Sequence, residues 1–119
     1  LLGTAETNMT YPLILARIPV SEPWQIFAYL PFGGWNDCPS TPELMAVSKY
    51  WYEQYGAVPS VLTHDELEYE LPTPVSKECA NKVAIQQYAF CPDMDQNYDS
   101  VGCLADTLRQ SKIWYFWWD

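Results

Sequence analysis

His64 is the only histidine in the chain, and Asp65 and Glu68 follow it within four positions. An imidazole next to carboxylates can act as a general acid or base, or can bind a divalent cation that activates water. Because a second histidine is missing, the two-histidine zinc motifs and the two-histidine, one-carboxylate iron site are excluded. The three residues are therefore candidate catalytic residues of a small metal-dependent hydrolase or nuclease. The alternative is that His64 and Asp65 only cap a hairpin turn.

A metal ion at His64 and Asp65 would need more oxygen ligands, because such cations take four or more donors. Asp93 and Asp119 are the candidates that the fold would have to bring near. The chain has no Gly-x-Ser-x-Gly elbow, no Walker loop and no Gly-x-Gly-x-x-Gly fingerprint. We therefore predict no cofactor, with a divalent cation at these residues as the alternative.

Four cysteines are spread along the chain without a Cys-x-x-Cys pair, so the closely spaced ligand pairs of a zinc knuckle are missing. We expect reduced thiols in a cytoplasmic protein. Reduced thiols leave a third possibility, a cysteine-dependent enzyme in which Cys38 or Cys91 is the nucleophile and His64 is its base. Such an enzyme would need a thiol whose pKa is lowered toward neutrality.

A loop rich in glycine and proline spans residues 31–39, and its two adjacent glycines permit positive φ. The loop places Trp35 and Asn36 next to adaptable backbone, which suits a binding surface. Tyr88 and Asp93 are the other predicted binding residues, and the aromatic side chains could line a pocket or a partner surface. The alternative is that these aromatic side chains belong to the core, as most do in a domain of this size.

The charge balance narrows the choice of partner. Six basic residues stand against fifteen acidic ones, which gives a formal net charge of −9. Nucleic acid and anionic membrane surfaces are disfavoured, because both attract Lys and Arg. A basic protein is the partner that this charge fits, although acidity can also serve only to keep an aromatic-rich domain soluble.

The segment Ile113–Asp119 is the strongest indication of the fold. Read as a strand, it has apolar side chains on both faces, and three of them are tryptophans. A strand solvated on one side alternates apolar and polar residues, whereas a strand buried on both sides is continuously apolar. The pattern predicts an interior strand with packed layers above and below it.

The remaining elements follow from capping residues and periodicity. We predict strands over residues 13–18, 57–63 and 67–71, helices over 42–55, 76–90 and 101–110, and over 24–30 either a strand or a short helical turn. Strands and helices interleave, so the predicted fold class is α/β, with α+β as the alternative. The predicted sheet is mixed, with about five strands, about three helices packed on it and the C-terminal strand at its centre. Residues 1–12 are a lead-in or the end of a linker, and residues 13–119 form a single globular domain.

Five segments carry a resemblance to a known family by their order and spacing: Gly33-Gly34-Trp35-Asn36-x-Cys38-Pro39, Trp51-x-x-x-Tyr55-Gly56-Ala57, Thr63-His64-Asp65-x-Leu67-Glu68, Gln87-Tyr88-Ala89-Phe90-Cys91-Pro92-Asp93 and Trp114-Tyr115-Phe116-Trp117-Trp118-Asp119. Over residues 20–119 the chain resembles the bacterial domain of unknown function family 4253. Its members commonly form the C-terminal part of a longer protein. The chain departs from the family's Asp-Gln-Gly pattern after Asp93, where it has Asp95-Gln96-Asn97-Tyr98.

This resemblance implies no activity, because the family has none assigned. It singles out motif positions, most of which are expected to be structural: Trp35, Asn36, His64, Asp65, Glu68, Tyr88, Cys91, Asp93 and Asp119.

The sequence favours an uncharacterised bacterial domain that acts as a non-catalytic protein-binding module, of the immunity or antitoxin kind, with a basic protein as its partner. The alternative is the small metal-dependent hydrolase or nuclease that uses His64 and nearby carboxylates. The sequence leaves open whether the chain is an enzyme and what its oligomeric state is.

Overall fold

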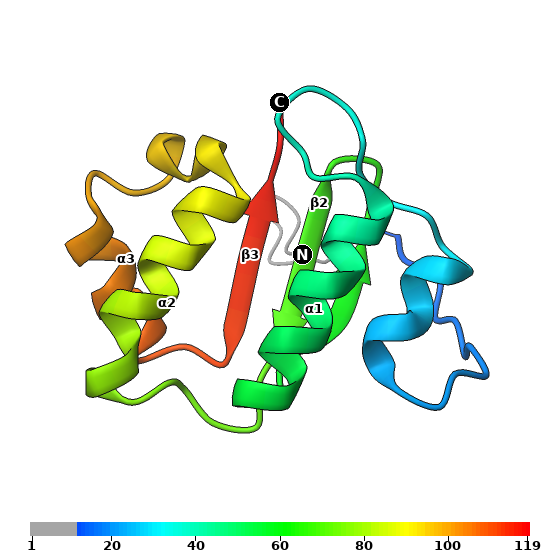
Figure 1. Ribbon diagram of the computed structural model, residues 1–119, viewed down its shortest axis with the longest axis horizontal. Coiled ribbons are helices and arrows are strands. Elements are labelled where there is room, and N and C mark those ends of the chain that lie inside the picture. Colours follow the sequence, from blue (N-terminus) through cyan, green and yellow to red (C-terminus); the bar gives the residue numbers. More distant parts are fainter. Residues whose placement is uncertain (1–11) are drawn as a thin grey trace.

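The sheet consists of three strands, β1 (Val58–Leu62), β2 (Glu66–Glu70) and β3 (Ile113–Trp117), in a computed structural model that describes residues 12–119. The strand order is β1-β2-β3 and both neighbouring pairs are antiparallel, so β2 is the central strand (Figure 1). The fold is mixed α+β, which was the alternative fold class. The predicted five-stranded mixed sheet is wrong, and so is the central position of the C-terminal strand. Among the described strands β3 pairs with β2 alone, which makes it an edge strand.

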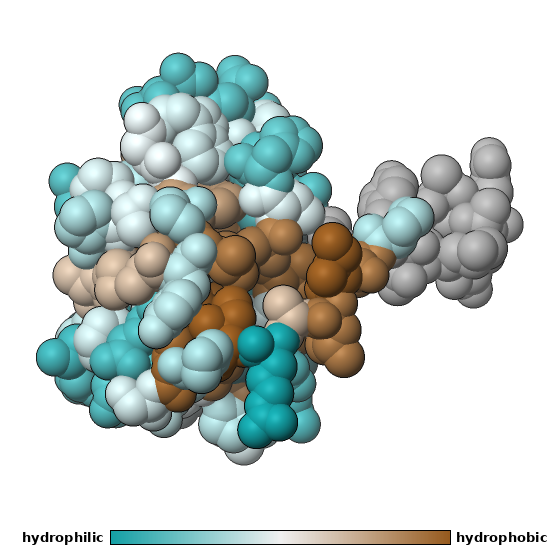
Figure 2. Space-filling view, turned by 90° about the vertical axis from the view of Figure 1, so that its right-hand side faces the viewer, coloured by the Kyte–Doolittle hydropathy of each residue, from teal (hydrophilic) through white to brown (hydrophobic). Residues whose placement is uncertain are grey.

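The predicted strand over residues 13–18 is not formed. This segment has no regular secondary structure, and Ile14 and Leu15 are 94% and 101% exposed. Branched side chains favour a strand only where a neighbouring strand supplies hydrogen bonds, and no strand of the described sheet pairs with this segment. Figure 2 shows hydrophobic residues gathered on the side of the molecule where residues 12–30 lie. The predicted lead-in over residues 1–12 falls, apart from Pro12, outside the described residues.

Of the two alternatives for residues 24–30, the helical turn is confirmed. A 3-10 helix, η1 (Pro23–Ala28), begins with a proline whose fixed φ suits the first helical position. The side-chain oxygen of Gln25 accepts hydrogen bonds from the N–H groups of Ser21 and Glu22 over 3.1 Å each. These contacts satisfy main-chain donors just before the first turn of the helix.

The three predicted α-helices are confirmed as α1 (Thr41–Tyr55), α2 (Lys77–Phe90) and α3 (Val101–Leu108), and a 3-10 helix, η2 (Pro92–Gln96), follows α2. Helix α1 begins where Ser40 Oγ accepts a hydrogen bond from the N–H of Glu43, and it ends at Gly56, whose φ is 72°. None of the helices in the described part of the chain is long and apolar enough to cross a membrane.

Helices α1 and α2 lie across one face of the sheet (Figure 1), and aromatic rings fill the space between these layers. The ring of Trp51 in α1 lies 5.3 Å from that of Trp114 in β3, 5.7 Å from that of Tyr69 in β2 and 5.0 Å from that of Phe90 in α2. A buried hydrogen bond of 2.6 Å joins the hydroxyl groups of Ser48 and Tyr69 within this core. The inner face of the sheet is therefore fully packed.

The other face of the sheet, called here the outer face, is lined by the following residues: Val58, Val61, Glu66, Glu68, Glu70, Ile113, Tyr115 and Trp117. Within residues 12–119, α3 packs on α2, and η1 packs on α1 and β1. In the middle of the outer face, Glu68 is buried, at 8% exposure. Tyr115 and Trp117 are half-buried, and Ile113 is 41% exposed. The prediction that the C-terminal strand is packed on both sides is therefore wrong. Tyr and Trp look apolar in a sequence pattern, but each carries a polar atom that can face solvent or a carboxylate.

Candidate functional site

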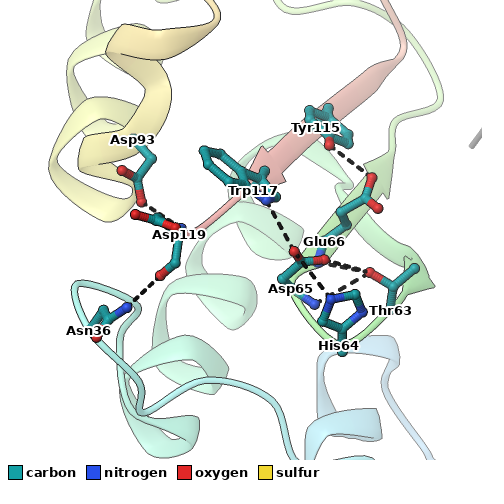
Figure 3. A network of polar contacts seen from close by, with 9 residues as sticks. All are labelled: Asn36, Thr63, His64, Asp65, Glu66, Asp93, Tyr115, Trp117 and Asp119. Carbon is teal, nitrogen blue, oxygen red and sulfur yellow. Dashed lines mark hydrogen bonds and ion pairs between the residues drawn. The ribbon is translucent and has the colours of Figure 1, made fainter.

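Several predicted site residues meet where β3 ends (Figure 3). Asp65 lies in the turn between β1 and β2, and its Oδ2 accepts a hydrogen bond from Trp117 Nε1 over 3.1 Å. Its main-chain oxygen accepts a second hydrogen bond, from the N–H of Trp118, over 3.2 Å. Asp65 therefore connects the β1–β2 turn to the end of the C-terminal strand.

His64 stands at the tip of the same turn and points to solvent. Its Nε2 lies 3.4 Å from Asp65 Oδ2, and its side chain is 89% exposed. The turn itself is closed by Thr63, whose Oγ1 accepts a hydrogen bond from the N–H of Glu66 over 2.9 Å. Within residues 12–119, the only carboxylate paired with the imidazole is thus one that also accepts the hydrogen bond of Trp117.

Asn36, from the loop before α1, and Asp93, from η2, approach the last residues of the chain. The N–H of Asp119 donates to Asp93 Oδ2 over 3.0 Å, and Asn36 Nδ2 donates to the main-chain oxygen of Asp119 over 2.7 Å. Cys91 Sγ donates to the main-chain oxygen of Trp117 over 3.1 Å. Motif residues that are far apart in the sequence therefore converge on three consecutive residues, Trp117–Asp119, and they do so mainly through main-chain contacts.

The carboxylates of this region are not arranged around a common point that could hold a cation. Among residues 12–119, no group of three or more His, Cys, Asp or Glu side chains is placed to bind a metal ion. Glu68, the third candidate catalytic residue, projects from the outer face of β2 and is 8% exposed. The structure brings His64 and Asp65 together, and it brings Asp93 and Asp119 together, as two separate pairs.

Burial works against nucleophilic chemistry at the two candidate thiols. Cys38 and Cys91 are both buried, and burial raises the pKa of each thiol to about 12. A thiolate is the reactive form, and almost none of it exists near neutral pH at such a pKa. The hydrogen bond from Cys91 to Trp117 gives this thiol a structural contact instead.

Trp35 and Tyr88 are half-buried, and they serve different parts of the fold. The ring of Trp35 packs against Phe32 at 5.0 Å and against Trp118 at 6.4 Å. The hydroxyl of Tyr88 donates to the main-chain oxygen of Tyr98 over 3.1 Å. An open groove of about 630 Å³ does lie between α1 and α2, but neither Trp35 nor Tyr88 lines it.

The sequence reasoning missed the chemistry of the outer face. In the β2–β3 register, Glu66 lies opposite Trp117 and Glu68 lies opposite Tyr115. The hydroxyl of Tyr115 donates to Glu66 Oε2 over 2.8 Å. Burial raises the pKa of the Tyr115 phenol, and the hydrogen bond to Glu66 and the negative charges of Glu66, Asp65 and Glu68 raise it further. The available signal was the glutamate at every second position of residues 66–70, because alternate residues of a strand share a face.

The comparisons with known proteins agree with the family resemblance. A family model described as a domain of unknown function, DUF4253, matches residues 14–119. No curated protein and no solved structure matches the chain. Because the matching model covers well over half of the chain, the chain belongs to the DUF4253 family.

Proposed function

We propose that this domain is a non-catalytic module that binds a basic protein partner. The observation that carries the proposal is the outer face of the sheet, where Glu70 is exposed and half-buried Glu66 lies beside Tyr115 and Trp117. Carboxylates next to aromatic rings are the groups that attract arginine and lysine side chains.

The overall charge supports the same partner. The chain carries a formal net charge of −9, so a basic protein is attracted before contact and its association is accelerated. Immunity proteins and antitoxins that block a basic partner are one class with this charge relationship. Asp65, Cys91 and Asp93, which sequence analysis singled out as candidate catalytic or metal-binding residues, make contacts that hold Trp117–Asp119 in place, and such structural contacts fit a non-catalytic module.

Affinity capture followed by reconstitution tests this proposal. The 119-residue chain is immobilised and exposed to a lysate of its own host, and captured proteins are identified, purified and titrated calorimetrically at low and physiological salt. The expected result is a basic partner that binds the purified chain and whose affinity falls as salt rises, because salt screens exposed charges. Reconstitution that yields no binding, or only an acidic partner whose affinity is independent of salt, would overturn the proposal.

A further inference from the structure

The groove of about 630 Å³ between α1 and α2, called here the α1–α2 groove, is lined mostly by apolar side chains. Trp51 and Phe90 are buried and form its floor, whereas Ala46 and Ala89 are exposed on its two walls. Within residues 12–119 the two helices pack chiefly on other helices, α1 on η1 and α2 on α3, rather than on each other. The groove therefore opens to solvent on the helical side of the sheet, opposite the outer face (Figure 1).

The polar groups along the groove favour a helical occupant. Most backbone groups of its walls are already hydrogen-bonded within their own helix. Trp51 Nε1 donates to Gln86 Oε1 over 3.1 Å, so these two side-chain atoms are engaged with each other. An extended segment would therefore bury its own N–H and C=O groups against apolar side chains with few partners. A helix brings its own backbone hydrogen bonds and avoids this cost.

The dimensions of the groove set the length of that helix. The lining residues of α1 run from Glu43 to Trp51, which is about 12 Å at a rise of 1.5 Å per residue. Two helical turns cover this distance and present apolar side chains at positions i, i+4 and i+7 to one side. Ala46 and Ala89 carry only a methyl group, so the walls allow another helix to approach closely.

Glu43 sets the charge of the occupant. In the described part of the chain it is the only charged residue that lines the groove, and it is exposed. Lys49, the basic residue of α1, lies instead over the ring of Trp24 in η1, at 5.4 Å from the ring centroid. The formal net charge of −9 adds to the attraction for a cation. A lysine or arginine that flanks the apolar side chains of the occupant can pair with Glu43, whereas a carboxylate there would be repelled.

We propose that the α1–α2 groove binds a two-turn amphipathic helix of a protein partner, with apolar side chains on Trp51 and Phe90 and a basic side chain at Glu43. The proposal goes beyond the proposed function and does not depend on it, because that function rests on the outer face and the groove lies on the other side of the sheet.

Two synthetic peptides of identical composition provide the probe. The amphipathic peptide is acetyl-Lys-Lys-Ala-Leu-Lys-Ala-Ala-Leu-Lys-Ala-Leu-Lys-Lys-Ala-amide, whose leucines share one side of a helix. The control peptide is acetyl-Lys-Lys-Ala-Leu-Lys-Leu-Ala-Ala-Lys-Leu-Ala-Lys-Lys-Ala-amide, in which the lysines keep their places and the leucines lie on different sides. Each peptide carries a fluorescent label, and fluorescence anisotropy measures its binding to the 119-residue chain.

Matched variants locate the site. A89Q places a longer, uncharged side chain in the groove, and A28Q makes the same change at an exposed position of η1. E43Q and E78Q each remove one charge from an exposed glutamate in the first turn of a helix, and only Glu43 lines the groove. Circular dichroism in the far and near ultraviolet shows whether each variant keeps the fold.

The amphipathic peptide should bind at least about tenfold more tightly than the control peptide. A89Q should weaken its binding by about tenfold, A28Q should change it less than about twofold, and E43Q should weaken it about threefold more than E78Q does. The proposal is overturned if the two peptides bind equally, if A89Q and A28Q have the same effect, or if neither peptide binds. Equal effects of E43Q and E78Q would overturn the assignment of a basic side chain to Glu43.

Light scattering after size exclusion tests the other occupant, a second copy of the chain. The expected result is a monomer for both the wild-type chain and A89Q, because two chains of the same net charge repel each other. A wild-type dimer that A89Q converts to a monomer would show that a second copy fills the groove and would overturn the proposal.

Discussion

Trp117 Nε1 donates a hydrogen bond to Asp65 Oδ2 over 3.1 Å, and this contact joins the end of β3 to the turn between β1 and β2. The main chain repeats the connection, since the N–H of Trp118 donates to the main-chain oxygen of Asp65 over 3.2 Å. One aspartate therefore fixes the strand end with both its side chain and its backbone. A His-Asp pair that suggests catalysis in the sequence here belongs to a structural junction.

Replacing Asp65 with alanine removes the acceptor of Trp117 Nε1 and leaves this half-buried donor without its partner. We expect the free energy of unfolding to fall by about 1–3 kcal/mol. Asp65→Asn should lower the free energy of unfolding by less, because the asparagine amide oxygen can still accept the hydrogen bond from Trp117 Nε1. Urea denaturation followed by tryptophan fluorescence measures both changes.

His64→Ala is the matched control for that series, because its side chain is 89% exposed. We expect His64→Ala to change the free energy of unfolding by no more than about 0.5 kcal/mol, as most surface substitutions do. If His64→Ala costs as much as Asp65→Ala, the stabilising role assigned to Asp65 is wrong.

Asn36 combines a hydrogen bond with an unusual backbone conformation. Its Nδ2 donates to the main-chain oxygen of Asp119 over 2.7 Å, and its φ is 44°. Both Asn36→Gly and Asn36→Ala lose the hydrogen bond, but only alanine is strained at positive φ, at a cost of about 1 kcal/mol. Chemical denaturation should therefore find Asn36→Ala less stable than Asn36→Gly by about this amount. Equal stabilities of the two variants would show that residue 36 does not keep a left-handed conformation.

Local signals were sufficient for the helices and for the hairpin. Gly56 ends α1 because it adopts positive φ at no steric cost, and Ser76 marks the start of α2. These effects involve residues within one turn of each other, so the sequence displays them directly. Local signals could not predict how far Tyr115 and Trp117 are buried on the outer face, because this burial depends on elements that are distant in the chain.

The candidate site was predictable as a set of positions but not as an arrangement. Asn36, Asp65 and Asp93 stood out as motif residues, yet nothing local indicates that all three contact Trp117–Asp119. Their convergence depends on how two loops and η2 meet at one end of the sheet. The same limit applies to the outer face, where alternating glutamates were visible but the β2–β3 register was not.

The four cysteines should differ in reactivity. Burial raises the pKa of Cys38 and Cys91 to about 12, whereas Cys103 is exposed on α3. Alkylation with iodoacetamide at pH 8, followed by peptide mass spectrometry, should label Cys103 first in the folded chain and should label Cys38 and Cys91 only after denaturation. Labelling of Cys91 as fast as that of Cys103 would show that its thiol is accessible and would reopen the cysteine-dependent alternative.

Two phenols should make the fold sensitive to alkaline pH. Burial raises the pKa of Tyr69 and Tyr115 above the ordinary value of about 10, and for Tyr115 the neighbouring carboxylates add to the effect. Above that value the unfolded chain has lost these protons while the folded chain keeps them, so the unfolded state binds fewer protons and the free energy of unfolding falls as pH rises. The stabilisation is fully present below the unfolded pKa and is lost between it and the folded pKa.

Fully buried Tyr69 should contribute a slope of at most about −1.4 kcal/mol per pH unit between about pH 10 and 11. Urea denaturation at a series of pH values from 8 to 11 measures the slope. Tyr69→Phe should make it shallower by about one proton, even though the lost hydrogen bond to Ser48 lowers stability at every pH. Tyr115→Phe should also make the slope shallower, but by a smaller amount, because the Tyr115 side chain is only half-buried. Parallel pH profiles for the wild-type chain and both variants would show that neither phenol stays protonated in the folded state beyond its ordinary range.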